Sequence, residues 1–130
     1  MVCYPTYGGS GIVATELGEA LAARGWEVHF ISYANPIRLD RFRENIFFHE
    51  VEIPHYPLFE FHLYTLALTG KILEVLKYEK LDIIHVHYAI PHAISGILSK
   101  QIAASSKVKL VTTLHGTDIT LIGLEPAFSQ

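Results

Sequence analysis

The sequence predicts an α/β fold in which helices cover both faces of a mostly parallel sheet. Three observations predict this class. Strand-like apolar runs alternate with helical patterns along the chain. A glycine-rich loop, Gly8–Gly11, joins the first predicted strand to the first predicted helix. The last predicted strand, Val108–Leu114, is almost continuously apolar, which is typical of a strand buried on both faces.

Each element is predicted from its apolar period and from the residues at its ends. The first helix runs from Ser10 to Arg24, with an apolar face at Leu17 and Leu21, an N-cap at Ser10 and Gly25 at C′. The predicted strands are Val2–Tyr4, Trp26–Tyr33, Ile46–Ile53, Asp82–His87 and Val108–Leu114. The other predicted helices are Leu63–Tyr78 and Pro91–Ala104. Ligands of such sheets bind beyond the carboxyl ends of the strands, so we expect the chemistry there.

The composition limits which classes of protein the chain can belong to. Its 130 residues predict one domain, and 50% apolar with 18% charged residues exclude a disordered chain. Ten Lys+Arg against thirteen Asp+Glu give a net charge of −3, so no nucleic-acid partner is expected. The single cysteine, Cys3, excludes an internal disulfide and favours the cytoplasm. No apolar run reaches the length of a membrane span, and no membrane partner is expected.

The glycine loop predicts a site for an anion. Consecutive glycines permit positive φ and close approach of a ligand, and the helix N-terminus behind them offers free N–H groups. Gly8, Gly9, Ser10 and Gly11 are therefore candidates to bind a phosphate or a carboxylate. The alternative is a tight turn without a ligand. A dinucleotide site is a weaker interpretation, because the next strand ends without the carboxylate that would hold a ribose.

Two more polar loops are predicted at the same edge of the sheet. His115 follows the last strand and could exchange a proton or bind a sugar hydroxyl. The next residue, Gly116, lets the backbone turn closely past a ligand, and Thr117 and Asp118 add polar groups that could bind it. The alternative interpretation of Asp118 is that it is the N-cap of a following helix. Tyr88 follows the preceding strand and offers either a hydroxyl for a ligand or an aromatic lid over the core.

The number of histidines raises the question of a metal site. His85 and His87 share one face of a strand and, with His92 or Asp118, could bind zinc or iron. Their apolar neighbours favour hydrogen-bonded core histidines, so neither a metal nor a cofactor is expected. The remaining four histidines are expected to be structural or exposed: His29, His49, His55 and His62.

Three motifs in this order resemble the N-terminal domain of the family-4 retaining glycosyltransferases. They are Gly-Gly-Ser-Gly at 8–11, His-Val-His-Tyr-Ala-Ile-Pro-His at 85–92 and Thr-Thr-Leu-His-Gly-Thr-Asp at 112–118. The likeness runs along essentially the whole chain. These enzymes have the GT-B architecture, in which two Rossmann-like domains face each other across a cleft. The longer runs at 3–11 and 114–120 are most similar to family members of the bacillithiol pathway.

The resemblance implies transfer of N-acetylglucosamine from UDP-GlcNAc to the hydroxyl of L-malate, with retention at the anomeric carbon. It implies that the glycine loop contacts the malate carboxylate or the donor diphosphate, while Tyr88 and Thr113 flank the acceptor. His115 is the implied catalytic residue, which hydrogen-bonds the sugar and stabilises an oxocarbenium-like state through its backbone. The leaving phosphate is expected to help deprotonate the acceptor, without a metal.

The resemblance also implies that residues 1–130 are only the acceptor-binding half of a longer protein. The sequence opens inside what reads as a strand, and the Glu-x7-Glu motif of the donor domain is absent from it. We expect this fragment to be inactive alone and to form homo-oligomers through its exposed cleft edge. Two alternatives stay open: a non-catalytic anion- or dinucleotide-binding domain, and a family-4 enzyme with another sugar or lipid acceptor. A lipid acceptor would use a basic-apolar face made by Arg38, Arg41, Phe42, Arg43 and Phe47.

Overall fold

A parallel sheet forms the centre of the structure. The computed structural model describes residues 1–36, 39, 43–54, 57–58, 63–104 and 107–127. Two pairs of strands are parallel within these residues. The first pair is β1 (Val28–Ser32) with β2 (Ile46–Glu50), and the second is β3 (Ile83–His87) with β4 (Lys109–Thr113).

The N-terminal segment joins the two strand pairs into one sheet. Val2 forms parallel bridges to Ile31 of β1 and to Val86 of β3. The order in space is therefore β2, β1, the segment at Val2, β3 and β4. The direction of chain progression reverses between the Val2 segment and β3, as in a Rossmann-like half-sheet. The predicted α/β class with a parallel sheet is confirmed.

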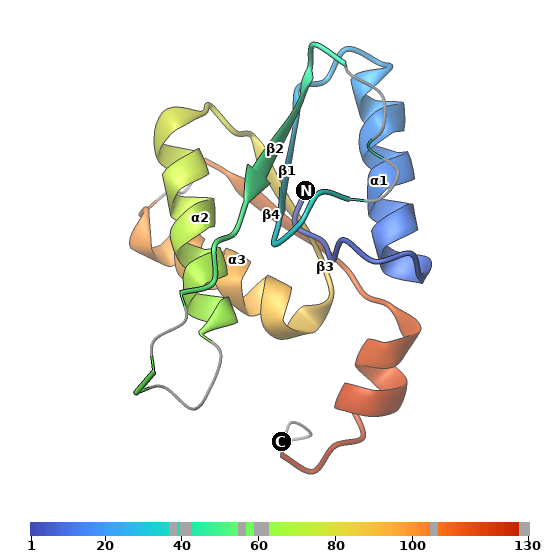
Figure 1. Ribbon diagram of the computed structural model, residues 1–130, viewed down its shortest axis with the longest axis vertical. Helices are drawn as coiled ribbons and strands as arrows, with labels where there is room; N and C mark the ends of the chain where they lie inside the picture. Colours follow the sequence, from blue (N-terminus) through green and yellow to red (C-terminus); the bar gives the residue numbers. More distant parts are fainter. Residues whose placement is uncertain (37–38, 40–42, 55–56, 59–62, 105–106, 128–130) are drawn as a thin grey trace.

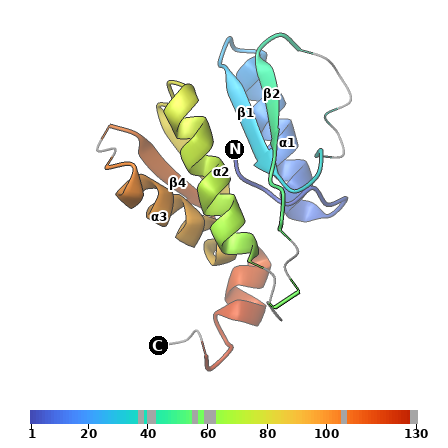
Figure 2. The ribbon, with the colours of Figure 1, turned by 60° about the vertical axis from the view of Figure 1, so that its left-hand side comes forward.

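Helices cover both faces of this sheet, as predicted (Figures 1 and 2). One face carries α1 (Gly9–Ala22), and the other carries α2 (Tyr64–Tyr78) and α3 (Ile94–Ile102), which pack against each other. Strand side chains alternate between the faces, so neighbouring residues of β1 enter different cores. Phe30 packs with residues of α1 and Ile31 packs with residues of α2, and both side chains are buried.

The buried face of α1 consists of small residues, so the apolar face predicted for this helix is wrong. Leu17 is 36% exposed and Leu21 is only partly buried. The buried positions are Ser10, Gly11, Ala14, Thr15, Gly18 and Ala22. Short side chains let the helix backbone approach the sheet closely, and Gly18 lies directly against the ring of Phe30. The bulkier residues consequently turn outward.

The N-terminal end of α1 differs from the prediction. The N-cap is Gly8, in extended conformation (φ −96°, ψ 158°), and no side chain forms a cap hydrogen bond. Ser10 lies inside the helix and is buried, so its predicted role as N-cap is wrong. Glycine is itself an accepted N-cap residue, which allows the helix to start two positions earlier.

The helix α1 ends at Ala22, two residues before the predicted end at Arg24, but Gly25 has the role predicted for it. The amides of Gly25 and Trp26 donate to the carbonyls of Ala22 and Leu21, at 3.0 and 3.2 Å. Gly25 has a φ of +87°, a conformation that side chains disfavour. This hydrogen-bond pattern is a Schellman motif with Gly25 at C′.

Two later elements also depart from the sequence prediction. Within the described residues β4 pairs only with β3, and Val111 is 43% exposed, so its predicted burial on both faces is wrong. The predicted helix Pro91–Ala104 is divided into a π-helical turn, η1 (Ala89–Ala93), and α3. The division falls between Ala93 and Ile94. The non-helical backbone of Ile90 (φ −118°, ψ 128°) lies inside η1, directly before Pro91, and is the conformation favoured before proline.

Some predicted features lie outside the described residues. They are His55, His62, Arg38, Arg41 and Phe42. Of the basic-apolar face suggested for a lipid acceptor, only Arg43 and Phe47 are described, so that alternative stays untested.

Replacement of Gly18 by alanine tests the close packing of α1. A Cβ at Gly18 would lie 2.3 Å from the Cζ atom of Phe30, whose side chain is fully buried. We expect Gly18→Ala to lower the free energy of unfolding by about 1–3 kcal/mol, as overpacking does. Gly70→Ala is the matched control, because nothing lies within 4 Å of its Cβ in α2. The control should raise stability by about 0.5–1 kcal/mol. Urea unfolding measures the free energy of unfolding of both variants. Equal changes in Gly18→Ala and Gly70→Ala would contradict the close contact between α1 and Phe30.

Candidate functional site

The three loops predicted to carry chemistry lie at the same edge of the sheet. The glycine loop follows the Val2 segment, the loop at Tyr88 follows β3, and the loop at His115 follows β4. These three strands are neighbours in the sheet, so their carboxyl ends are adjacent. Figures 1 and 2 both show the start of α1 and the segment after β4 at the same end of the molecule. This is the edge where the strand order reverses, the usual ligand position in such sheets.

The glycine loop presents backbone N–H groups at this edge. Gly8 and Gly9 are exposed, and the described residues offer no acceptor to the amides of Gly9 and Ser10. The amide of Gly11 donates to the carbonyl of Gly8 at 3.1 Å. A Cβ at Gly11 would lie 2.5 Å from the carbonyl oxygen of Thr6, so only glycine lets the loop fold this tightly. The helix N-terminus is thus chemically suited to a carboxylate or phosphate.

Asp118 connects the loop after β3 to the loop after β4. Its Oδ1 accepts a hydrogen bond from the amide of Ala89 at 3.0 Å, and its Oδ2 accepts one from the amide of His115 at 2.8 Å. The side chain is buried at 7% exposure. Thr117, not Asp118, is the N-cap of the following helical turn, η2 (Asp118–Ile122). The structure therefore gives Asp118 a scaffolding role, and its contact with a substrate stays a prediction.

Tyr88 has a strained backbone that its surroundings hold in place. Its φ of +83° is rare for a residue with a side chain and costs about 1–3 kcal/mol. Its amide donates to the carbonyl of Thr113 at 3.0 Å, and its carbonyl accepts from the amide of Ala93 at 3.1 Å. The centre of its ring lies 4.7 Å from that of His115. The strain thus places an aromatic side chain beside the predicted catalytic histidine.

Two buried histidines, His87 and His92, are connected to His115 by hydrogen bonds. The side chain of His87 is fully buried, and its Nδ1 lies 3.1 Å from Nε2 of His115. His92 is also fully buried and bonds through Nδ1 to the carbonyl of His87 and through Nε2 to the hydroxyl of Tyr64. Burial lowers the pKa of His87 to about 3 and that of His92 to about 4. Both rings are therefore neutral at neutral pH.

The remaining predicted site residues are Thr113, whose hydroxyl has a partner within the protein, and the exposed pair Gly116 and Thr117. The hydroxyl of Thr113 is bonded to Nε2 of His85 at 2.7 Å, and its contact with an acceptor stays a prediction. Gly116 and Thr117 are exposed, and a Cβ at Gly116 would meet nothing within 4 Å. The loop therefore leaves open space beside His115.

An aromatic cluster at this edge was missed by the sequence analysis. The ring of Tyr4 contacts four others, those of Tyr33, Tyr64, Tyr88 and His92, with centre-to-centre distances of 4.4–6.4 Å. Burial raises the pKa of Tyr4 and of Tyr64. Tyr4, Tyr33 and Tyr88 each follow the end of a strand, so the rule that places ligands there could have found them.

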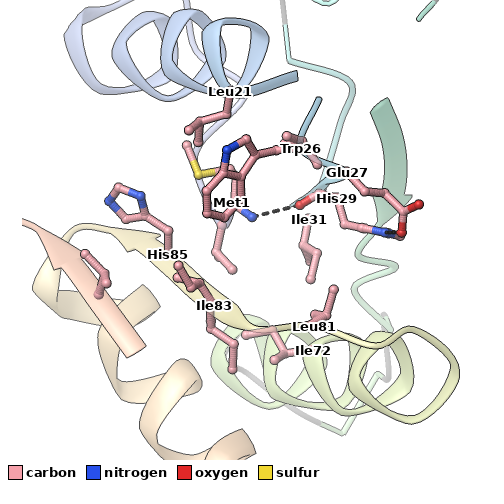
Figure 3. Close-up of a pocket in the computed structure, with 14 residues that line it drawn as sticks. Met1, Leu21, Trp26, Glu27, His29, Ile31, Ile72, Leu81, Ile83 and His85 are labelled. Carbon is pink, nitrogen blue, oxygen red and sulfur yellow. Dashed lines mark hydrogen bonds and ion pairs between the residues drawn. The ribbon is translucent and has the colours of Figure 1, made fainter. Parts of the chain in front are cut away.

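The opposite edge of the sheet carries an apolar cavity and a candidate cation cluster. The cavity has a volume of about 190 Å³ and is lined by Trp26, Ile83 and His85, among others (Figure 3). The cluster consists of Glu27, His29 and Glu79, whose ligand atoms lie within 4.8 Å of one another. Both ring nitrogens of His29 already form hydrogen bonds, Nε2 with Glu27 at 3.0 Å and Nδ1 with His49 at 2.8 Å, so His29 has no free nitrogen for an ion. Neither feature includes a residue predicted to bind the substrate, although His85 was weighed above as a metal ligand.

Comparison with known proteins shows that the chain belongs to a class of sugar-transferring enzymes. The model of Glycosyltransferase Family 4 matches residues 7–128, which confirms the family predicted from the three motifs. One curated relative is N-acetyl-alpha-D-glucosaminyl L-malate synthase of Bacillus anthracis, which is 53% identical over 130 residues. The match covers 100% of this chain but 34% of that relative's length. Among the described residues, no helix is long and apolar enough to cross a membrane.

Removal of the Asp118 carboxylate tests the connection between the two loops. Asp118→Ala leaves the amides of Ala89 and His115 without their acceptor, and we expect a loss of about 2–4 kcal/mol in the free energy of unfolding. Asp82→Ala is the matched control, because Asp82 is exposed, and it should change stability by less than about 0.5 kcal/mol. Denaturant unfolding measures both. A loss no larger than the control's would mean that Asp118 does not hold the loops.

The lowered pKa values of His87 and His92 predict acid sensitivity. An unfolded histidine titrates near 6.5, so below that pH the unfolded state binds protons that the folded state excludes. Stability is therefore lost as the pH falls from about 7 toward 4, by up to about 1.4 kcal/mol per pH unit for each ring. We expect the urea midpoint to fall between pH 7 and pH 5, and the slope to be shallower in His92→Phe. A midpoint independent of pH would refute this account.

Proposed function

We propose that this chain is the acceptor-binding part of a retaining glycosyltransferase that transfers N-acetylglucosamine from UDP-GlcNAc to L-malate. The proposal rests on family membership and on the printed name of the Bacillus anthracis relative. The structural observation that carries it is the pair of N–H groups at Gly9 and Ser10, which have no acceptor among the described residues. They belong to the start of α1, which lies at the same end of the molecule as the segment after β4 (Figures 1 and 2). Malate is a small dianion, and a helix N-terminus is suited to bind one of its carboxylates.

The proposed roles of the residues are those that the resemblance to the family implies. A carboxylate of malate binds the amides at the start of α1, and Tyr88 and Thr113 flank the acceptor. His115 hydrogen-bonds the transferred sugar. The bond from the anomeric carbon to the leaving phosphate breaks, and the bond to the malate oxygen forms on the same face. The proton of the malate hydroxyl goes to the leaving phosphate, so the proposal requires neither a protein base nor a metal or other cofactor.

The remaining parts of the proposal concern the whole protein. A second domain binds most of the UDP-GlcNAc molecule, so the 130 residues alone do not catalyse transfer. The protein acts in the cytoplasm on small-molecule substrates and takes part in bacillithiol biosynthesis. The proposal also includes self-association of the chain through its exposed cleft edge.

Removal of a single backbone N–H tests the malate site. Gly9 is the first residue of α1, and the extended backbone of Gly8 is compatible with a proline after it. Gly9→Pro therefore deletes one donor while keeping the helix, and we expect its affinity for L-malate to fall about tenfold or more. Gly9→Ala keeps the donor, and nothing lies within 4 Å of its Cβ, so its affinity should be unchanged. Calorimetric titration measures both.

The same titration separates the competing functions. L-malate should bind more tightly to the chain than UDP-GlcNAc or NAD does. Absence of malate binding, or equal affinities in Gly9→Pro and Gly9→Ala, would refute the proposed malate site. Tighter binding of NAD would favour a dinucleotide-binding domain instead.

A further inference from the structure

His87 is a buried histidine that contacts His115 through one ring nitrogen and leaves the other without a partner among the described residues. It is fully buried at the end of β3, and its ring stacks on that of His115 with centres 5.3 Å apart and planes at 25°. Nδ1 lies 3.1 Å from Nε2 of His115. Nε2 is buried without a hydrogen-bond partner among the described residues. The ring therefore makes one hydrogen bond, and that bond goes to the residue proposed to contact the sugar.

The unpartnered nitrogen decides where the proton of His87 resides. Burial keeps this ring neutral at neutral pH, so it carries one N–H. With the proton on Nε2, a buried donor would be left without an acceptor, and buried N–H groups without partners are rarer than under-satisfied acceptors. With the proton on Nδ1, the donor is satisfied by His115 and only a lone pair is unpartnered. The favoured form of His87 is therefore the one that donates from Nδ1.

A donor at His87 makes Nε2 of His115 an acceptor. A neutral His115 must then carry its own proton on Nδ1. This Nδ1 has no partner among the described residues, and the ring is only partly buried. The amide of His115 is held by Asp118 at 2.8 Å, so the backbone of this residue is anchored independently of its ring.

We propose that His87 is a positioning residue that holds neutral His115 in its Nδ1–H form, so that His115 offers a hydrogen-bond donor to the ligand at Nδ1. The role of that donor rests on the proposed function, in which the ligand is the hydroxyl-bearing sugar. The tautomer itself is a property of the chain without substrate. The chemical class recognised is a hydroxyl oxygen that accepts a hydrogen bond.

The tautomer can be measured directly in the chain labelled with ¹⁵N at histidine. Long-range ¹H–¹⁵N correlation spectra at pH 7.5 distinguish a protonated ring nitrogen from an unprotonated one. We expect His115 to be mainly Nδ1–H in the wild-type chain. In His87→Phe, which keeps a ring but removes the donor, the Nδ1–H form should become the minor one. In His87→Asn, whose side-chain amide places an N–H near the original Nδ1, the Nδ1–H form should again be the major one.

His29→Phe is the matched control, since it replaces another buried histidine at the opposite edge of the sheet and should leave His115 unchanged. A wild-type spectrum with His115 mainly Nε2–H would overturn the proposal, and this measurement does not depend on any variant folding. An unchanged tautomer in a folded His87→Phe would overturn it as well. Failure of the malate titration with the Nδ1–H form intact would refute the proposed function and leave this inference standing.

Discussion

The N-terminal segment at Val2 is the constraint on which the rest of the structure depends. Its amide donates to the carbonyl of His85 at 2.8 Å, and its carbonyl accepts from the amide of His87 at 2.9 Å. On its other side it bridges to Ile31 of β1. Through these bonds the segment joins two strand pairs that otherwise share no ladder, and it creates the reversal of strand order. The glycine loop and the loop at Tyr88 are neighbours because the strands before them are.

A second level of order connects the loops themselves. The carboxylate of Asp118 spans 29 residues of sequence to reach Ala89 and also holds the amide of His115. Tyr88 adopts its positive φ between these bonds and the one to Thr113. The site is therefore organised from backbone to side chain: sheet order places the loops, one carboxylate connects them, and buried His87 contacts the ring of His115.

The sequence predicts the part of this arrangement that depends on local patterns. Alternating apolar periods predict the α/β class, and Gly25 is recognisable because a positive φ selects for glycine. The edge rule places the glycine loop and His115 together. The exposure of Leu17 and of Val111 depends on how closely other elements pack against α1 and β4. The local spacing of apolar residues carries no information about that distance. The positive φ of Tyr88 opposes the preference of its own residue type, so only tertiary bonds explain it.

The position of the single tryptophan has a spectroscopic consequence. Trp26 ends the Schellman motif after α1 and lines the apolar cavity at the amino edge of the sheet (Figure 3). Four of the tyrosines, by contrast, lie together at the carboxyl edge, where the rings of Tyr33, Tyr64 and Tyr88 surround that of Tyr4. The indole thus reports on the end of the molecule opposite to this tyrosine cluster. Selective excitation of this indole therefore follows the apolar amino edge of the sheet, separately from the end where the ligand is proposed to bind.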